Sequence, residues 1–215
     1  MTTNKYSEIF DQLQNELISF RQNPAVIAVS KYVGSEEIKT AYDAGFRDFG
    51  ENRVSDLMEK VEALRESCPD IRWHFIGNIQ SNKIKDLMSI SELYSIHSLD
   101  SLKHLKMIGE RAIAPLKIFI QVNTSDESQK GGILHEDEVQ QFITEIDHYP
   151  YLFFEGLMTM ASLDGDLESA RASFQKLTTF AKDRNPKFSM GMSGDYQIAL
   201  EEGSHYVRIG SMIFR

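Results

Sequence analysis

The stretch VIAVSK, residues 26–31, is a short run of apolar, mostly β-branched residues that ends in a lysine. A continuous apolar run of this length is typical of a strand buried on both faces, as in a parallel sheet. The lysine at its carboxyl end either extends its ammonium to solvent or serves as a desolvated amine that can react with an aldehyde. Residues 26–31 alone leave both interpretations open.

Seven further strand-like runs follow, and helical patterns separate them. The predicted strands after the first cover residues 47–51, 73–77, 93–96, 116–122, 153–160, 188–192 and 206–209. The predicted helices begin at Ser35 or cover residues 53–65, 82–88, 100–111, 135–146, 167–182 and 196–201. Strands that alternate with helices in this way indicate a parallel sheet covered by helices.

The number of units and the length of the chain predict one (β/α)8 TIM barrel, a single domain over residues 1–215. Apolar residues spaced three and four apart within residues 4–22 predict an extra N-terminal helix before the barrel. The main alternative is an open doubly wound sheet. Such a sheet usually has fewer strands and a glycine-rich phosphate loop after the first one, where this sequence has few glycines.

Charge and composition exclude several kinds of partner. The formal net charge of −9 argues against binding to nucleic acid or to anionic membranes, because both need a basic surface. Cys68 is the one cysteine, so no internal disulfide is possible and a reducing compartment fits. The N-terminal residues lack a signal-peptide pattern, and no apolar run approaches the roughly 18 residues of a membrane span. We therefore expect a cytoplasmic protein, and a monomer, because no long exposed apolar helix face requires a partner.

Two turns at the carboxyl ends of the last two predicted strands carry the residues best suited to bind an anion. They are GMSGD, residues 191–195, and GS, residues 210–211. Small residues let backbone N–H groups approach an anion closely, and the serines add hydroxyls. Either turn alone would pass for a helix cap. Because (β/α)8 barrels commonly bind phosphate after strands seven and eight, the two together predict a phosphate site that includes Ser193, Gly210 and Ser211.

A lysine after strand one and a phosphate site after strands seven and eight lie across the same barrel mouth. An aldehyde that bears a phosphate, above all pyridoxal 5′-phosphate (PLP), needs both features. Arg208 would then face the pyridine ring and, since arginine only donates hydrogen bonds, would keep the ring nitrogen unprotonated. That arrangement suits holding the cofactor more than carbanion chemistry. The alternative is a Schiff-base aldolase acting on a sugar phosphate, although such barrels more often carry the lysine on a later strand.

Other familiar sites are absent from the sequence. There is no G-x-x-x-x-G-K-[ST] loop and no G-x-G-x-x-G fingerprint, and Asp195 occupies the last glycine position of a nucleophile elbow. The histidines lack metal-ligand spacing, so no metal site is expected. His74 lies in mid-strand beside Trp73, where a hydrogen-bonded core histidine is as plausible as a functional one.

Seven short segments together form a recognisable pattern. They are VSK (29–31), FGEN (49–52), HFIGNIQSNK (74–83), VN (122–123), GLMTM (156–160), MGMSGD (190–195) and VRIGS (207–211). From about residue 24 to the C-terminus, this pattern resembles the pyridoxal-phosphate homeostasis protein family. Tyr32, Arg53 and Ser55 depart from the residues usual in that family, and none of them belongs to the predicted Schiff-base or phosphate groups.

The resemblance implies a barrel similar to the N-terminal domain of alanine racemase, with PLP held as an internal aldimine on Lys31. It also implies the other cofactor-binding residues: Ser193, Gly210 and Ser211 at the phosphate, Arg208 at the pyridine nitrogen, and Asn52, His74 and Met160 along the pocket. Family members hold PLP without a settled enzymatic activity, so no catalytic residue is expected, and PLP-dependent apo-enzymes are the expected recipients. A PLP-dependent racemase is the alternative. A related racemase takes its second base from another domain, for which we expect no room here.

Overall fold

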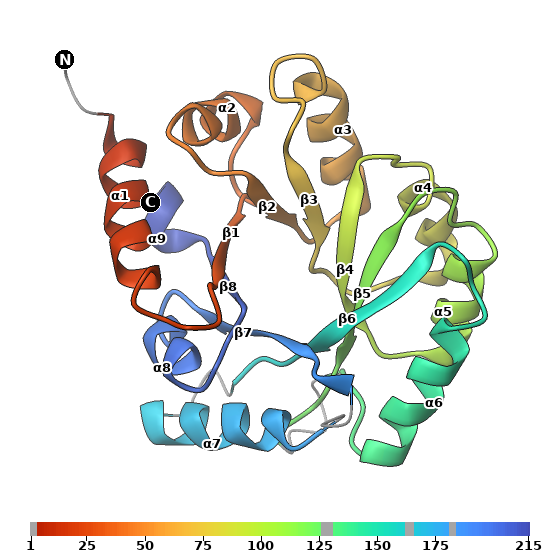
Figure 1. Ribbon diagram of the computed structural model, residues 1–215. Coiled ribbons are helices and arrows are strands. Elements are labelled where there is room, and N and C mark those ends of the chain that lie inside the picture. The colour runs from red at the N-terminus through yellow and green to blue at the C-terminus, as the bar shows by residue number, and fades with distance from the viewer. Residues whose placement is uncertain (1–3, 126–130, 162–165, 181–183) are drawn as a thin grey trace.

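The strands pair side by side in chain order, and the last returns to the first (Figure 1). All pairings are parallel, so the ladder closes into a barrel between β8 and β1. The computed structural model describes residues 4–125, 131–161, 166–180 and 184–215. The strands are β1 Ala25–Val29, β2 Asp48–Glu51, β3 Arg72–Phe75, β4 Leu93–Leu99, β5 Leu116–Gln121, β6 Leu152–Met158, β7 Lys187–Met192 and β8 Tyr206–Ile209.

The helices surround the ring of strands (Figure 1). They are α1 Lys5–Leu17, α2 Ser35–Asp43, α3 Val54–Leu64, the 3-10 turn η1 Ser81–Lys83, α4 Ile84–Leu87, α5 Leu102–Gly109, α6 Glu136–Ile146, α7 Leu167–Thr178, α8 Tyr196–Glu201 and α9 Ser211–Phe214. None of the helices within the described residues has the length and apolar character needed to cross a bilayer.

Helix α1 lies between α8 and α2 in the outer ring, beside α9 (Figure 1). Asn4 caps it by accepting a hydrogen bond from the N–H of Tyr6 at 3.3 Å. The Tyr6 ring packs on Phe214 of α9, and Tyr196 of α8 donates a hydrogen bond to Glu16 at 2.8 Å. Helices α1 and α9 therefore share the position after β8, which confirms the predicted extra N-terminal helix.

Strand side chains alternate between two separate cores, as the period of a β-strand requires. On β1, Val26 and Ala28 join the large core between the sheet and the helices. Ile27 points the other way, into the barrel. There it belongs to a small apolar cluster whose other buried members are Phe119, Met158 and Tyr206. The apolar run that predicted β1 thus serves both cores at once.

The register of β1 against β8 decides which residues share the carboxyl mouth of the barrel. Ile27 lies opposite Arg208, although the two are far apart in the chain. Alternation then directs Val29 and Gly210 into the same mouth, where a Cβ on Gly210 would lie 3.4 Å from the Cβ of Val29. Lys31 follows Val29 with the same parity. Closure of the barrel therefore brings the lysine and the last two predicted turns together.

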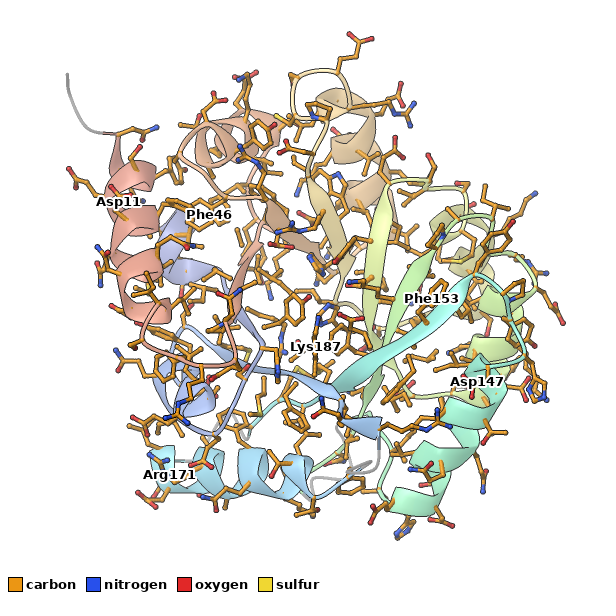
Figure 2. The ribbon with its side chains drawn as sticks, in the orientation of Figure 1. Asp11, Phe46, Asp147, Phe153, Arg171 and Lys187 are labelled. Carbon is orange, nitrogen blue, oxygen red and sulfur yellow. The ribbon has the colours of Figure 1, made fainter. Side chains whose placement is uncertain are left out.

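The opposite mouth, at the amino ends of the strands, carries charged side chains. Glu155 of β6 forms ion pairs with Lys117 of β5 at 3.3 Å and with Lys187 of β7 at 2.7 Å. Figure 2 shows Lys187 within the ring of strands, whereas Asp11 and Arg171 lie on the outer helices. The amino mouth is thus occupied by paired charges, whereas the carboxyl mouth carries Lys31 and the turns after β7 and β8.

The predicted (β/α)8 barrel is confirmed, with small differences in the elements. β1 ends at Val29, so Lys31 lies in the turn after the strand and is not its last residue. β4 continues to Leu99, and the short helix α9 was not predicted. The helix predicted over 167–182 corresponds to α7, which ends at Thr178, and residues 181–182 lie outside the described ranges.

Gly156 is required where β6 passes β7. A Cβ at this position would clash with the backbone carbonyl of Lys187, which cannot move without disturbing the ladder. We expect Gly156→Ala to lower the free energy of unfolding by about 2 kcal/mol or more. Gly194→Ala is the control, because no atom lies within 4 Å of a Cβ there. Equal denaturation midpoints for the two variants would contradict the clash.

Candidate functional site

A cavity of about 1110 Å³ opens at the carboxyl ends of the strands. Its volume lies just above the range typical of ligand pockets, about 300–1,000 Å³. Strand ends and the turns after them supply most of its wall, as expected for the functional face of a (β/α)8 barrel. The lining residues used below are Val29, Lys31, Tyr32, Asn52, Arg53, Lys83, Met160, Ser193, Gly194, Arg208, Gly210, Ser211 and Arg215.

Lys31 lies in the turn that follows β1. The turn is held by hydrogen bonds from the N–H of Ser30 to the carbonyl of Gly50 at 3.0 Å and from the N–H of Val33 to the carbonyl of Ser30 at 3.1 Å. Lys31 Nζ lies 5.0 Å from the centroid of the Tyr32 ring. Among the described residues, no carboxylate lies within ion-pair distance of this amine. Its position at the cavity wall leaves the amine available to a ligand.

A buried ion pair lies directly behind this turn. Glu51, at the end of β2, is 0% exposed, and Lys60 of α3 reaches it with Nζ 2.6 Å from Oε1. The same Nζ donates to the Ser30 carbonyl at 2.9 Å, and the Ser30 hydroxyl donates to Glu51 Oε1 at 2.6 Å. Burial raises the pKa of Glu51 despite these contacts. The cluster joins the ends of β1 and β2 to helix α3, so it holds the residue before Lys31 in place.

The turns after β7 and β8 are connected to each other. The N–H of Met192 donates to Asp195 Oδ1 at 2.5 Å, which closes the first turn. The N–H of Gly210 donates to the Ser193 hydroxyl at 3.4 Å, which joins it to the second. Helix α9 begins immediately afterwards at Ser211. Because the first N–H groups of a helix have no partner within it, the joined turns present donors toward the cavity.

Arg208 lies at the base of the cavity and is 5% exposed. Its Nη1 donates to the carbonyl and to the hydroxyl of Ser189, both at 2.8 Å. Its Nη2 donates to the carbonyl of Thr159, also at 2.8 Å. Burial lowers the pKa of Arg208 to about 10, so the guanidinium stays charged at neutral pH. These bonds hold a fixed positive charge beneath the mouth.

The cavity is cationic although the chain as a whole is acidic. The sequence has 32 acidic and 23 basic residues, yet none of the described lining side chains carries a carboxylate. Charges of one sign within a concave site raise the local concentration of oppositely charged ligands. The basic residues of the lining are Lys31, Arg53, Lys83, Arg208 and Arg215. The site is therefore suited to an anionic ligand.

The structure brings together all but one of the residues predicted for the site. Those that line the cavity are Lys31, Asn52, Met160, Ser193, Arg208, Gly210 and Ser211. His74 is the exception, because it is not among the residues that line the cavity. It is 0% exposed in the barrel interior, where its ring nitrogens contact Asp48, Ser95 and His97. The alternative of a hydrogen-bonded core histidine describes its position.

The sequence-based search missed the Glu51–Lys60 pair and three of the cavity cations. The signal for the pair was present, because Lys60 lies on the same helix face as Leu57, Val61 and Leu64, and all four are buried. A charged residue on a buried stripe requires a partner, and Glu51 in a short buried strand could have supplied it. Arg53, Lys83 and Arg215 had no such signal, since each lies in a turn or at a helix end.

Comparison with known proteins identifies relatives of the chain. A family model described as "Alanine racemase, N-terminal domain" matches residues 10–215. The pyridoxal phosphate homeostasis protein of Schizosaccharomyces pombe is 37% identical over 203 residues, which cover 90% of this chain and 84% of that protein. The protein of the same name from Vibrio alginolyticus is 40% identical over 201 residues, covering 88% of this chain and 84% of its own length.

Solved structures give the same result. The structure of PipY from Synechococcus elongatus without PLP matches with a TM-score of 0.87 at 29% identity and covers 97% of this chain and 99% of PipY. PipY with PLP bound matches with a TM-score of 0.86 at 28% identity, covering 98% of this chain and 100% of PipY. Alanine racemase from E. faecalis has a TM-score of 0.75 at 15% identity and covers 97% of this chain and 58% of the racemase, so it shares the fold alone.

Removal of Lys60 should expose the cost of burying Glu51. We expect Lys60→Met to reduce the free energy of unfolding by about 3 kcal/mol at neutral pH, because the carboxylate is left without its cation. Burial raises the pKa of Glu51, so the folded state takes up its proton more readily than the unfolded state does. The difference in free energy of unfolding between wild type and Lys60→Met should therefore shrink as the pH is lowered from neutral to mildly acidic. Denaturant titrations at several pH values would measure it.

Lys39→Met is the matched control for that experiment. Lys39 pairs with Asp43 one helical turn away at 2.8 Å, and both side chains are largely exposed. Exposed pairs of this kind contribute little to stability, so the denaturation midpoint should stay unchanged at every pH. A Lys60→Met deficit that matches the control, or that grows as the pH falls, would contradict the role of the buried pair.

Proposed function

The chain belongs to the pyridoxal phosphate homeostasis proteins, and we propose that it binds PLP at the carboxyl mouth of its barrel through a covalent bond to Lys31. The observation that carries the proposal is the placement of an amine and a phosphate-type turn across one cationic cavity. PipY, which shares the fold at 28% identity, has PLP bound in its solved structure. Relatives at 37% and 40% identity are named for PLP homeostasis.

The residues present fit the phosphate of PLP at one end of the cavity. Ser193, Gly194, Gly210 and Ser211 all line this end, where two hydroxyls and the first N–H groups of α9 can donate to a phosphate. A Cβ on Gly194 would meet no atom within 4 Å, so that side of the turn is open to a ligand. The loops after the last two barrel strands, with a short extra helix, form a common phosphate site of this fold. Helix α9 supplies that extra helix.

The residues also fit the other functional groups of the cofactor. Lys31 supplies a primary amine, which condenses with an aldehyde carbon with loss of one water. Arg208 presents a donor-only charged group from below, which suits an unprotonated ring nitrogen. Asn52 and Met160 complete the wall. PLP itself supplies the electrophilic aldehyde and the conjugated ring, while these residues bind it and set its orientation.

The lining favours storage of the cofactor over turnover. Its titratable side chains are lysines, arginines and Tyr32, which is 78% exposed. General acid–base catalysis needs a second group positioned against the reacting atom, and an exposed tyrosine beside Lys31 is poorly held for that task. The names of the relatives describe homeostasis proteins and no enzymatic reaction. A holding function without a catalytic residue therefore agrees best with the site.

The same proposal covers the location of the protein, its oligomeric state and the recipients of its cofactor. An acidic chain with one buried, unpaired cysteine suits the cytoplasm as a monomer. The cavity opens at the barrel mouth, so a bound cofactor can leave without unfolding of the barrel. PLP-dependent apo-enzymes are the chemical class that would receive it. Size-exclusion chromatography with light scattering tests the monomer.

Lys31→Ala should abolish covalent attachment of PLP while leaving weak binding through the phosphate contacts. Purified protein incubated with PLP should be yellow. Borohydride reduction should add the cofactor mass to the peptide that carries Lys31, and the variant should lose that adduct. Lys187→Ala is the control, because this amine lies at the opposite mouth of the same barrel (Figure 2). A colourless wild type, or an adduct on another lysine, would overturn the assignment.

Ser193→Ala should weaken PLP binding by about 1 kcal/mol or somewhat more, the usual loss for a hydrogen bond to a charged group. The measurement is the dissociation constant from absorbance titration. Pyridoxal, which lacks the phosphate, serves as the matched ligand control, and its dissociation constant should be the same in wild type and variant. Equal losses for both ligands would place Ser193 away from the phosphate.

A further inference from the structure

The barrel interior contains a continuous line of hydrogen-bonded polar side chains beneath the cavity. It begins at Arg208, whose Nη1 lies 2.8 Å from the Ser189 hydroxyl. Ser189 Oγ lies 2.8 Å from His97 Nδ1, and His97 Nε2 lies 3.1 Å from His74 Nδ1. His74 Nε2 lies 2.9 Å from Asp48 Oδ1. The interiors of such barrels are usually filled by branched apolar side chains, so this line is a departure that needs a reason.

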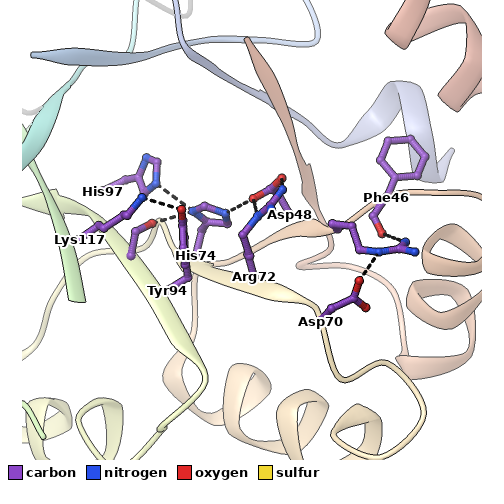
Figure 3. A network of polar contacts seen from close by, with 10 residues as sticks. Phe46, Asp48, Asp70, Arg72, His74, Tyr94, His97 and Lys117 are labelled. Carbon is purple, nitrogen blue, oxygen red and sulfur yellow. Dashed lines mark hydrogen bonds and ion pairs between the residues drawn. The ribbon is translucent and has the colours of Figure 1, made fainter. Parts of the chain in front are cut away.

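Figure 3 shows the part of this line nearest the amino mouth. Asp48 and Arg72 face each other at 2.5 Å, and the His74 ring lies between Asp48 and His97. Ser95 also contacts His74 Nδ1, at 2.6 Å. Since Asp48 begins β2 and Arg208 lies on β8 at the base of the cavity, the line runs from one mouth of the barrel to the other.

The two ends of the line have opposite hydrogen-bonding roles, because one can only donate and the other can only accept. The guanidinium of Arg208 can only donate. Asp48 can only accept while it is ionised. Burial alone would raise the pKa of Asp48, but hydrogen bonds from Arg72 and His74 outweigh it and lower the pKa to about 2. The carboxylate is therefore charged at any pH at which the protein functions.

These two ends determine which nitrogen of His74 and of His97 carries hydrogen, and to which atom the Ser189 hydroxyl donates. Asp48 accepts from His74 Nε2–H, so Nδ1 of that neutral ring carries a lone pair. That lone pair faces two donors, His97 Nε2–H at 3.1 Å and the Ser95 hydroxyl at 2.6 Å. His97 Nδ1 then accepts from the Ser189 hydroxyl, which leaves the lone pairs of Ser189 Oγ for Arg208. Every acceptor between Arg208 and Asp48 then faces a donor.

The reverse direction fails at Asp48. If the Ser189 hydroxyl accepted from His97 Nδ1–H, then His97 Nε2 would accept from His74 Nδ1–H. The lone pair of His74 Nε2 would then face the Asp48 carboxylate at 2.9 Å with no hydrogen between two acceptors. Two buried acceptors in contact carry the full cost of an unmade hydrogen bond and of their repulsion.

A charged His74 would also satisfy Asp48, but its surroundings oppose the charge. Both histidines are 0% exposed, and burial lowers the pKa of each. Asp48 raises the pKa of His74, but burial outweighs it, and Arg72 and Lys117 lower this pKa as well. The neighbouring His74 and Arg208 lower the pKa of His97. The His97 ring stacks on the Phe119 ring, with the ring centroids 4.2 Å apart. Burial therefore favours the neutral form of both rings.

We propose that Ser189, His97 and His74 are positioning residues, which hold Arg208 under the cofactor ring through a one-directional hydrogen-bonded line anchored on Asp48. The link from Arg208 to the cofactor rests on the proposed function, whereas the direction of the line does not. The line fixes the Ser189 hydroxyl as an acceptor for Arg208, so rotation of the guanidinium away from it would leave this buried oxygen without a donor. This explains why the interior at this level is polar.

The direction is tested on the wild-type protein without any cofactor. In protein labelled with 15N-histidine, long-range NMR correlations distinguish protonated from unprotonated ring nitrogens. Both His74 and His97 are expected to carry hydrogen on Nε2 alone throughout the pH range in which the protein stays folded. Hydrogen on Nδ1 of either ring, or a doubly protonated His74, would overturn the line as assigned.

The positioning role is tested with Ser189→Ala. This variant removes one oxygen and leaves Arg208 its bonds to backbone carbonyls. It should weaken PLP binding about fivefold or more and shift the visible absorbance maximum of the bound cofactor. Ser204→Ala is the control: Ser204 is also 0% exposed and bonded to backbone carbonyls, but it lies outside the line. Its affinity and spectrum should match the wild type.

The NMR measurement and the binding measurement test different parts of the proposal. An unchanged affinity and spectrum in Ser189→Ala, with the wild type binding normally, would remove the positioning role. Equal losses in Ser189→Ala and Ser204→Ala would reduce the effect to the loss of a buried hydroxyl. A wild type that binds no PLP would refute the proposed function, while the tautomers measured without cofactor would still decide the direction of the line.

Discussion

The ladder between β1 and β8 is the constraint on which the site depends. It sets Ile27 opposite Arg208, and the alternation of strand side chains then carries Val29 and Lys31 into the mouth that Arg208 and Gly210 already face. No contact local in sequence could do this, because residues 31 and 208 lie near opposite ends of the chain. A slip of one residue in that register would reverse the facing of the strand that slipped, so either the residues of β1 or Arg208 of β8 would point away from the mouth. The site is thus a consequence of barrel closure.

Positive charges line the cavity that barrel closure forms, and the nearby buried carboxylates are paired away from it. Two buried carboxylates near the site are kept off the cavity wall: Glu51 pairs with Lys60 of α3 behind the Lys31 turn, and Asp48 lies at the far end of the interior line. Cations occupy the wall itself. Buried charges are expensive unless paired, so both carboxylates need their partners to be tolerated at all. The result is an anion site with a rigid, positively charged floor in a protein whose overall charge is negative.

Much of this could be predicted from the sequence, because periodicity and turn chemistry are local. The alternation of apolar runs and helical patterns predicted the barrel, and the parity of residues 27, 29 and 31 is already present in VIAVSK. The pairs Ser193 with Gly210 and Lys60 with Glu51 depend on register and helix rotation, which a linear reading does not supply. His74 shows the limit most clearly. Its segment matched a known motif, but only the structure shows that the ring lies below the cavity, hydrogen-bonded to Asp48 and His97.

The most direct test of the central claim is a crystal structure of this protein grown with PLP. Continuous electron density should join Lys31 Nζ to the cofactor, with the phosphate between Ser193 and Ser211 and the Arg208 guanidinium facing the ring nitrogen. Density that ends at Nζ of Lys31, or a phosphate bound instead beside Arg53 and Lys83 on the other side of the mouth, would contradict it.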